Sequence, residues 1–179
     1  MKRIISASDQ SSHKECYHAC KHQLAIYNQT TIEEFDKRKE MLKELLKDVG
    51  EDSYIEPPFY CDYGKNIRVG AHFYANYGCV MVDTGNITIG DHVLLGPGVH
   101  VYCASHPINA LQRATGMEYV EDVVIGDHVW IGGNTTINPG VVIGEGSVIG
   151  SGSVVTHDIP ANVVAAGNPC KVLRKIEKE

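Results

Sequence analysis

Aliphatic residues recur at every sixth position over long stretches of the chain. The positions are Ile89, Leu95, Val101, Ile125, Ile131, Ile137, Ile143, Ile149 and Val155. A period of six matches neither an amphipathic helix, which repeats about every 3.6 residues, nor the alternation of a long strand. It matches a short strand followed by a tight turn, since three such units close a triangular coil and coils stack at strand spacing. The pattern therefore predicts a parallel β-helix with a thin aliphatic core and flat faces that favour association with other copies.

The repeat shifts phase in its early part and stops in its later part. VGAHFY and ANYGCV, which begin at Val69, fit the same template two residues out of phase, and the shift falls at residues 83–86. The period stops altogether within VYCASHPINALQRATGMEY, residues 101–119, where a histidine is followed by a proline. We therefore expect the chain to leave the repetitive scaffold at this stretch.

The chain before the repeats has helical spacing. Residues 12–28 place cysteine, tyrosine and leucine side chains on one side at helical intervals. Thr31 and Glu34 form a capping-box signal, because a hydroxyl and a carboxylate three residues apart can bind the free amides of a first turn. The second helix that this signal opens is expected to stop at Gly50.

Two consecutive prolines mark the change from helix to repeat. They lie in IEPPF, residues 55–59, and end helical structure because proline lacks the amide hydrogen and its ring clashes with the preceding turn. We expect a mainly β protein with a helical segment at residues 1–54 and the β-helix at residues 55–179.

Composition excludes several classes of protein. The formal net charge of −6 argues against nucleic acid as the partner, which requires clustered Lys and Arg. The first ten residues carry no apolar core of a signal peptide, and no apolar run approaches the roughly 18 residues of a membrane helix. We therefore expect a cytoplasmic protein whose six cysteines are thiols.

Five motifs occur along the chain in a fixed order. They are PPFYCDYG, FYANY, SHP, VWIGGNTTINPGVVIG and NPCKVLRKI. Together they resemble the maltose and galactoside O-acetyltransferases of the hexapeptide-repeat acyltransferases, over nearly the whole chain. The resemblance implies a left-handed β-helix, a homotrimer, acetyl-CoA as donor, a sugar hydroxyl as acceptor and an active site between neighbouring subunits. It also implies that residues 102–120 form the active-site loop and residues 159–179 a C-terminal tail.

The resemblance implies an active site centred on a histidine. An alcohol attacks a thioester only with a base for its proton and donors for the oxyanion. The resemblance assigns the base to His106, and free imidazole is largely neutral at slightly basic pH. It places Asn76 beside the histidine, to bind the acceptor or stabilise the oxyanion. It places Glu118 nearby, either to orient the imidazole or to bind sugar hydroxyls.

Other positions match the family's acceptor and coenzyme A contacts. On the acceptor side these are Asp9, which would also serve as an ordinary helix N-cap, Asp62, which stands where some relatives carry serine, and Tyr74. The pantetheine groove would be lined by Gly133, Ser151, Thr156 and His157. The phosphate-binding cations would be Lys171 and Arg174, although a charged chain end is also commonly just solvated.

Alternatives remain at this point. One is an acetyltransferase of the same fold with a non-sugar acceptor. Another is a zinc-dependent carbonic anhydrase of the γ class, but His72, His92 and His128 recur in phase at one turn position, which is typical of outward turn residues. We expect no metal site. Cys103 lies close to His106, yet the family transfers acetyl directly, so we expect no acyl-cysteine.

Overall fold

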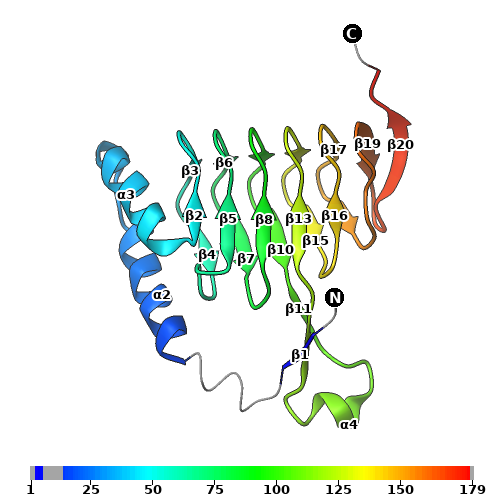
Figure 1. Cartoon of the computed structure of the whole chain (residues 1–179), viewed down its shortest axis with the longest axis horizontal. Helices are drawn as coiled ribbons and strands as arrows, with labels where there is room; N and C mark the ends of the chain where they lie inside the picture. Colours follow the sequence, from blue (N-terminus) through cyan, green and yellow to red (C-terminus); the bar gives the residue numbers. More distant parts are fainter. Residues whose placement is uncertain (1–2, 6–13, 178–179) are drawn as a thin grey trace.

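The computed structural model describes residues 3–5 and 14–177. In this part of the chain, short parallel strands stack into a prism, with helices at its N-terminal end and a hairpin at its C-terminal end (Figure 1). The aliphatic residues of the six-residue repeat all lie in the core of the prism. The predicted parallel β-helix of hexapeptide repeats is therefore confirmed.

Three sheets form the faces of the prism in the described residues. The first contains β2 (Asp48–Val49), β5 (Ile67–Val69), β8 (Ile87–Ile89), β13 (Val123–Ile125) and β16 (Val142–Ile143). The second contains β3 (Tyr54–Ile55), β6 (Tyr74–Ala75), β9 (Leu94–Leu95), β14 (Trp130–Ile131), β17 (Val148–Ile149), β19 (Val163–Ala166) and β20 (Lys171–Lys175). The third contains β4 (Tyr60–Cys61), β7 (Val80–Val82), β10 (His100–Tyr102), β15 (Thr136–Ile137) and β18 (Val154–Val155).

Successive coils place their inward residues directly above one another. Val69 lies opposite Ile89, and Ile125 lies opposite both Ile89 and Ile143. All four side chains are buried. Burial of one such side chain stabilises the fold by about 1.5–3 kcal/mol, so the thin core is stable only because the coils repeat.

One edge of the prism, between the third and first sheets, is larger in the early coils. The inward residues that flank this edge are Met81 and Ile89 in an early coil, but Ile137 and Ile143 in a late one. The early edge thus holds two additional residues, which confirms the predicted phase shift. The expanded corner, as this edge is named below, consists of residues 62–66, 83–86 and 103–122.

A buried aspartate fills the expanded corner. The Oδ1 atom of Asp83 accepts hydrogen bonds from the backbone N–H groups of Asp62 and Tyr63, both at 2.9 Å. The Asn66 side chain donates to the Asp83 carbonyl at 2.7 Å. Burial raises the pKa of the Asp83 carboxyl, although the backbone donors act in the opposite direction. The carboxylate therefore replaces the missing turn hydrogen bonds of the longer corner.

The predicted break in the repeat is a loop that projects from the expanded corner. Its two arms are β11 (Ala104–Ser105) and β12 (Glu118–Val120), which pair antiparallel. The short helix α4 (Ala110–Arg113) lies at the tip, away from the prism (Figure 1). The N-terminal strand β1 (Arg3–Ile5) pairs with the other side of β12. The arms of the loop are therefore held by sheet hydrogen bonds.

The N-terminal helices confirm the helical prediction but end earlier than expected. Helix α2 (Lys14–Tyr27) buries Cys20, Leu24 and Tyr27 at the predicted spacing. The capping box opens the 3-10 helix η1 (Ile32–Glu34), where the backbone of Thr31 donates to Glu34 at 2.9 Å. Helix α3 (Phe35–Leu45) stops before Gly50, because Asp48 and Val49 pair with β5 and begin the first coil.

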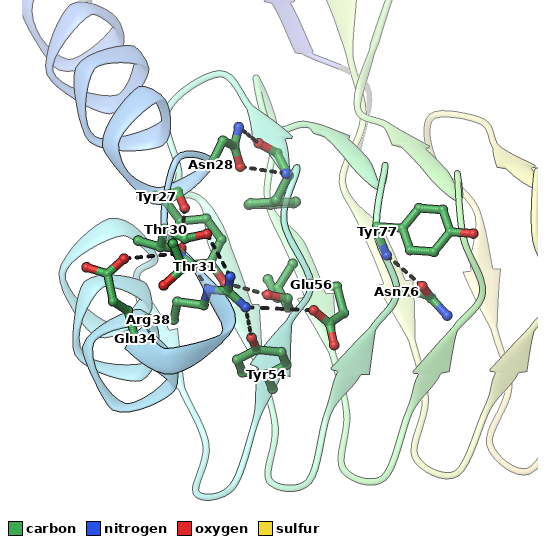
Figure 2. Close-up of polar contacts among 12 residues, drawn as sticks. Tyr27, Asn28, Thr30, Thr31, Glu34, Arg38, Tyr54, Glu56, Asn76 and Tyr77 are labelled. Carbon is green, nitrogen blue, oxygen red and sulfur yellow. Dashed lines mark hydrogen bonds and ion pairs between the residues drawn. The ribbon is translucent and has the colours of Figure 1, made fainter.

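Arg38 of α3 fastens the helices to the prism (Figure 2). Its side chain is only 5% exposed. It donates to the Thr30 hydroxyl at 2.7 Å, to the Thr30 carbonyl at 2.8 Å, and to the hydroxyl of Tyr54 on β3. Glu56 lies 3.9 Å from the guanidinium. These contacts fix the position of α2, which borders the expanded corner.

No helix among the described residues is long and apolar enough to cross a membrane.

Candidate active site

The expanded corner holds a cavity of about 670 Å³. Helix α2 lines one side with Lys14, Tyr17 and His18. The corner itself contributes Asp62, Tyr63 and Thr84, and the ends of β7 and β10 beside it contribute Val82 and Tyr102. The projecting loop contributes Ala104, His106 and Glu118. Three separate parts of the sequence therefore meet at the place where the repeat is interrupted.

His106 follows β11 directly and lies at the wall of the cavity. Its Nδ1 atom is 3.3 Å from the carbonyl oxygen of Met117 on the opposite arm of the loop. A carbonyl oxygen only accepts hydrogen bonds, so this contact requires the proton on Nδ1 and leaves Nε2 able to accept one. Pro107 is buried, and the Arg113 guanidinium donates to its carbonyl at 2.9 Å. The chain after the histidine is therefore well fixed.

Glu118 lines the same cavity at the start of β12. Among the described residues, no hydrogen bond joins its carboxylate to His106, whose Nδ1 faces Met117 instead. This arrangement favours the second of the two roles expected for Glu118, contact with acceptor hydroxyls. Burial, Asp62 and Asp83 raise the pKa of Tyr63, and the Glu118 carboxylate adds a smaller effect in the same direction.

Asp62 also lines the cavity, and two contacts hold it. Its backbone N–H donates to Asp83, and its Oδ1 atom lies 3.0 Å from the ammonium of Lys21 on α2. Among the predicted site residues that the structure describes, Asp62, His106 and Glu118 line this cavity.

Asn76 and Tyr74 lie elsewhere, at β6 and the corner between the second and third sheets. The Asn76 carboxamide oxygen accepts the backbone N–H of Tyr77 at 2.8 Å (Figure 2). Neither Asn76 nor Tyr74 lines the cavity in the described part of the chain. Burial, together with Glu56, raises the pKa of the Tyr74 hydroxyl.

The predicted coenzyme A residues fall on two corners. Gly133 and Ser151 lie at the corner of Asn76, one coil apart, and their strands β14 and β17 pair. Thr156 and His157 lie after β18, on the edge that carries the expanded corner, with the hydroxyl 2.9 Å from the imidazole Nδ1. Within the described residues of one chain, these four residues therefore do not line a single groove.

The predicted cations lie at the last strand of the second sheet. Lys171 and Arg174 are exposed on β20, and Arg174 is paired in register with Val164 of β19. Asp9 lies outside the described residues.

Two alternatives find no support in the geometry. Cys103 is buried, and burial raises the pKa of its thiol to about 12, which opposes formation of a nucleophilic thiolate. His72, His92 and His128 stack along an outer edge, with ring centroids 4.7 and 4.9 Å apart, and do not converge. The described residues contain no group of three or more potential ligands placed to hold a metal ion.

Sequence reasoning missed several residues that line or support the cavity. Tyr17 was expected in the packing face of its helix, but it is partly exposed and borders the cavity. Thr84 belongs to the expanded corner and Tyr102 ends the strand that leads into it, where a six-residue template makes no prediction. The phase shift itself was the available signal, because an enlarged turn is where a repetitive surface can become concave.

Comparisons with known proteins agree with this architecture. Residues 122–157 match the family "Bacterial transferase hexapeptide (six repeats)", and residues 14–50 match "Maltose acetyltransferase hexapeptide capping motif". The galactoside O-acetyltransferase of Escherichia coli (strain K12) is 48% identical over 84% of this chain and 74% of its own.

Two solved structures are also similar. A maltose O-acetyltransferase from Clostridium difficile 630 has a TM-score of 0.94 and 48% identity, over 98% of this chain and 94% of its own. A galactoside acetyltransferase in complex with coenzyme A has a TM-score of 0.94 and 42% identity, over 98% and 87%.

The fold and the interrupted repeat thus define a hexapeptide-repeat acyltransferase with a left-handed β-helix, as the resemblance implied. Within that class, the chain belongs to the maltose and galactoside O-acetyltransferase family and is an acetyltransferase.

Proposed function

We propose that the protein transfers the acetyl group of acetyl-CoA to a hydroxyl of a sugar bound in the cavity of the expanded corner. The observation that carries the proposal is the placement of His106, with Nδ1 directed at Met117 and the ring at the wall of a cavity that also holds Asp62 and Glu118. Carboxylates accept hydrogen bonds from sugar hydroxyls, and the neighbouring tyrosines offer ring faces to the apolar side of a sugar.

The proposed step needs one base and no metal. The acceptor hydroxyl gives its proton to Nε2 of His106 while its oxygen attacks the thioester carbonyl carbon. The tetrahedral intermediate collapses as the new ester C–O bond remains and the C–S bond breaks. The imidazolium returns its proton to the departing thiolate, so free coenzyme A and the acetylated sugar leave.

The separation of the predicted residues onto two corners supports a site shared between copies. Asn76, Gly133 and Ser151 lie away from His106 in one chain, so a neighbouring copy would supply them as oxyanion donor and pantetheine groove. Ile108 and Leu111 at the loop tip are 97% and 82% exposed, and Trp130 is 54% exposed on the second sheet. Exposed apolar groups of this size are typical of protein interfaces. We propose a homotrimer, as in the implied family arrangement, with three such sites.

Acetyl-CoA is proposed as donor because a similar galactoside acetyltransferase has been solved with coenzyme A. Lys171 and Arg174 would contact its phosphates, and Thr156 and His157 would border the thioester side. Tyr74 and Asp9 would contribute to the acceptor side.

An acceptor panel with free-thiol detection tests the proposal. Acetyl-CoA is incubated with maltose, glucose, a β-galactoside, glycerol and a primary amine, and the product is identified by mass spectrometry. Thiol release that depends on a sugar, with an added acetyl ester on that sugar, is the expected result. Release with the amine or glycerol alone would instead establish a non-sugar acceptor, and no release with any of them would overturn the proposal.

A further inference from the structure

Helix α2 contacts the expanded corner through Lys21, a residue that lies outside the five motifs. The Lys21 ammonium lies 3.0 Å from Oδ1 of Asp62 and 2.5 Å from the carbonyl oxygen of Cys61. Beside it, the Sγ atoms of Cys20 and Cys61 are 3.6 Å apart in the core. The lysine therefore sits on a helix whose position against β4 is fixed by packing.

The Asp62 carboxylate lies between this lysine and the cavity. Its side chain is 28% exposed, and that of Lys21 is 38% exposed. Asp62 lines the cavity, whereas Lys21 does not. Within residues 3–5 and 14–177, Lys21 binds Oδ1 of Asp62, and no hydrogen bond involves Oδ2. The second oxygen is thus available to accept a hydrogen bond from a ligand.

Negative charge accumulates at this wall of the cavity. Asp83 lies behind Asp62 and accepts its backbone N–H, and Glu118 lines the cavity as well. Burial lowers the pKa of Lys21, but the hydrogen bond and charge of Asp62 outweigh this effect and raise it overall. The lysine therefore remains protonated and offsets one of the neighbouring carboxylates.

We propose that Lys21 is a positioning residue that fixes Asp62 for an acceptor hydroxyl and sets the preference for neutral over cationic acceptors. This inference rests on the proposed function. The ammonium binds Oδ1 and so fixes the orientation of the carboxylate, with Oδ2 directed toward the acceptor. It also neutralises the carboxylate, which would otherwise attract an amino sugar. Lys21 touches neither substrate in this account, and it acts only through Asp62.

The test compares Lys21→Met with wild type for glucose and glucosamine as acceptors. The expected result is an increase of about tenfold in KM for glucose, because a hydrogen bond to a charged group is weakened. The kcat and the KM for acetyl-CoA change little. The KM for glucosamine rises less or falls, so the preference shifts toward the cationic acceptor. Lys21→Arg, which keeps the charge, restores part of the affinity for glucose.

Lys39→Met is the matched control. Lys39 also joins a helix to the first coil, through Asp52 at 3.5 Å, but it lies away from this cavity. It is expected to leave both acceptor KM values unchanged. A double variant with Lys21→Met and Asp62→Asn should be no worse for glucose than Asp62→Asn alone, since Lys21 acts through that carboxylate.

The outcomes separate this inference from the proposed function. If wild type turns over sugars but Lys21→Met keeps the glucose KM and the preference, only the inference is overturned. If Lys21→Met lowers the melting temperature and kcat while the acceptor preference stays constant, Lys21 is structural and the inference is again overturned. If wild type acetylates no acceptor, the proposed function has failed. Trace labelling of lysines with acetic anhydride then tests whether Lys21 pairs with Asp62. Lys21 must become more reactive in Asp62→Asn, and equal reactivity would contradict the pairing.

Discussion

Two corners of the same prism differ in what their backbones permit. At the corner after the second sheet, a Cβ atom on Gly96 would lie 2.5 Å from the backbone nitrogen of Gly133 in the next coil. At the expanded corner, two additional residues per early coil leave room for a buried carboxylate, a cavity and the projecting loop, residues 102–120. Both corners keep the same register of inward aliphatic residues. The comparison teaches that the regular turns supply a fixed frame, and that the irregular turns are where the surface of the prism becomes concave.

The strongest test of this comparison mixes two inactive variants. His106→Asn removes the base at the expanded corner, and Asn76→Ala removes the proposed oxyanion donor at the tight corner, each with a loss of about 10²-fold or more. If a site takes one residue from each of two copies, co-expressed chains form some sites with both residues intact. Random mixing then restores roughly a quarter of wild-type activity, because each intact contribution is present in half of the copies.

The measurement is thiol release by the purified mixed oligomer, with each variant alone as its control. Light scattering gives the mass of the same sample. If the mixed oligomers stay as inactive as the separate variants, either each site takes both residues from one chain or Asn76 is not part of the site.

The tight corner should be intolerant of a single methyl group. Gly96→Ala is expected to lower the free energy of unfolding by about 3 kcal/mol, because the new Cβ meets backbone that cannot move without separating two coils. Gly152→Ala is the matched control, since its Cβ meets no atom within 4 Å and only its positive φ of 71° is strained. That variant should lose about 1 kcal/mol. Urea unfolding followed by circular dichroism compares the two, and equal losses would show that coil spacing is not limiting.

The contribution of the expanded corner to the free energy of unfolding should depend on pH. Burial raises the pKa of Asp83 above its ordinary value of 3.8, so the folded state binds more protons than the unfolded state just above that value. Its contribution to stability therefore falls as the pH rises through the interval between the two values. Asp83→Asn keeps an oxygen acceptor and removes the charge, so its unfolding free energy should fall less between pH 4 and neutrality. Parallel slopes for the variant and wild type in this interval would mean that Asp83 titrates normally.

The repeat made most of the fold predictable. The period of six shows which side chains face the core, so the coils could be predicted from the spacing of residues such as Ile125 and Ile143. The end of α3 did not follow, because the pairing of Val49 with Val69 is a contact between distant segments that overrides helical spacing.

The candidate site was predictable only in part. His106 drew attention because it lies where the repeat stops, but its expected role, like those of Asp62 and Glu118, came from the family resemblance. Lys21 gave no signal, since a lysine at one turn of a helix is ordinary until the fold brings Asp62 to it. The role of Met117 could not be predicted either, because it acts through its backbone carbonyl.

The most direct test of the central claim compares the same substitution at two histidines. His106→Asn alters the expanded corner, and His72→Asn alters an exposed outer turn whose φ of 55° asparagine readily adopts. With the sugar that wild type acetylates, His106→Asn should lose about 10²–10⁴-fold in kcat while its melting temperature is maintained, and His72→Asn should keep wild-type turnover. Full turnover by a folded His106→Asn enzyme would contradict the account.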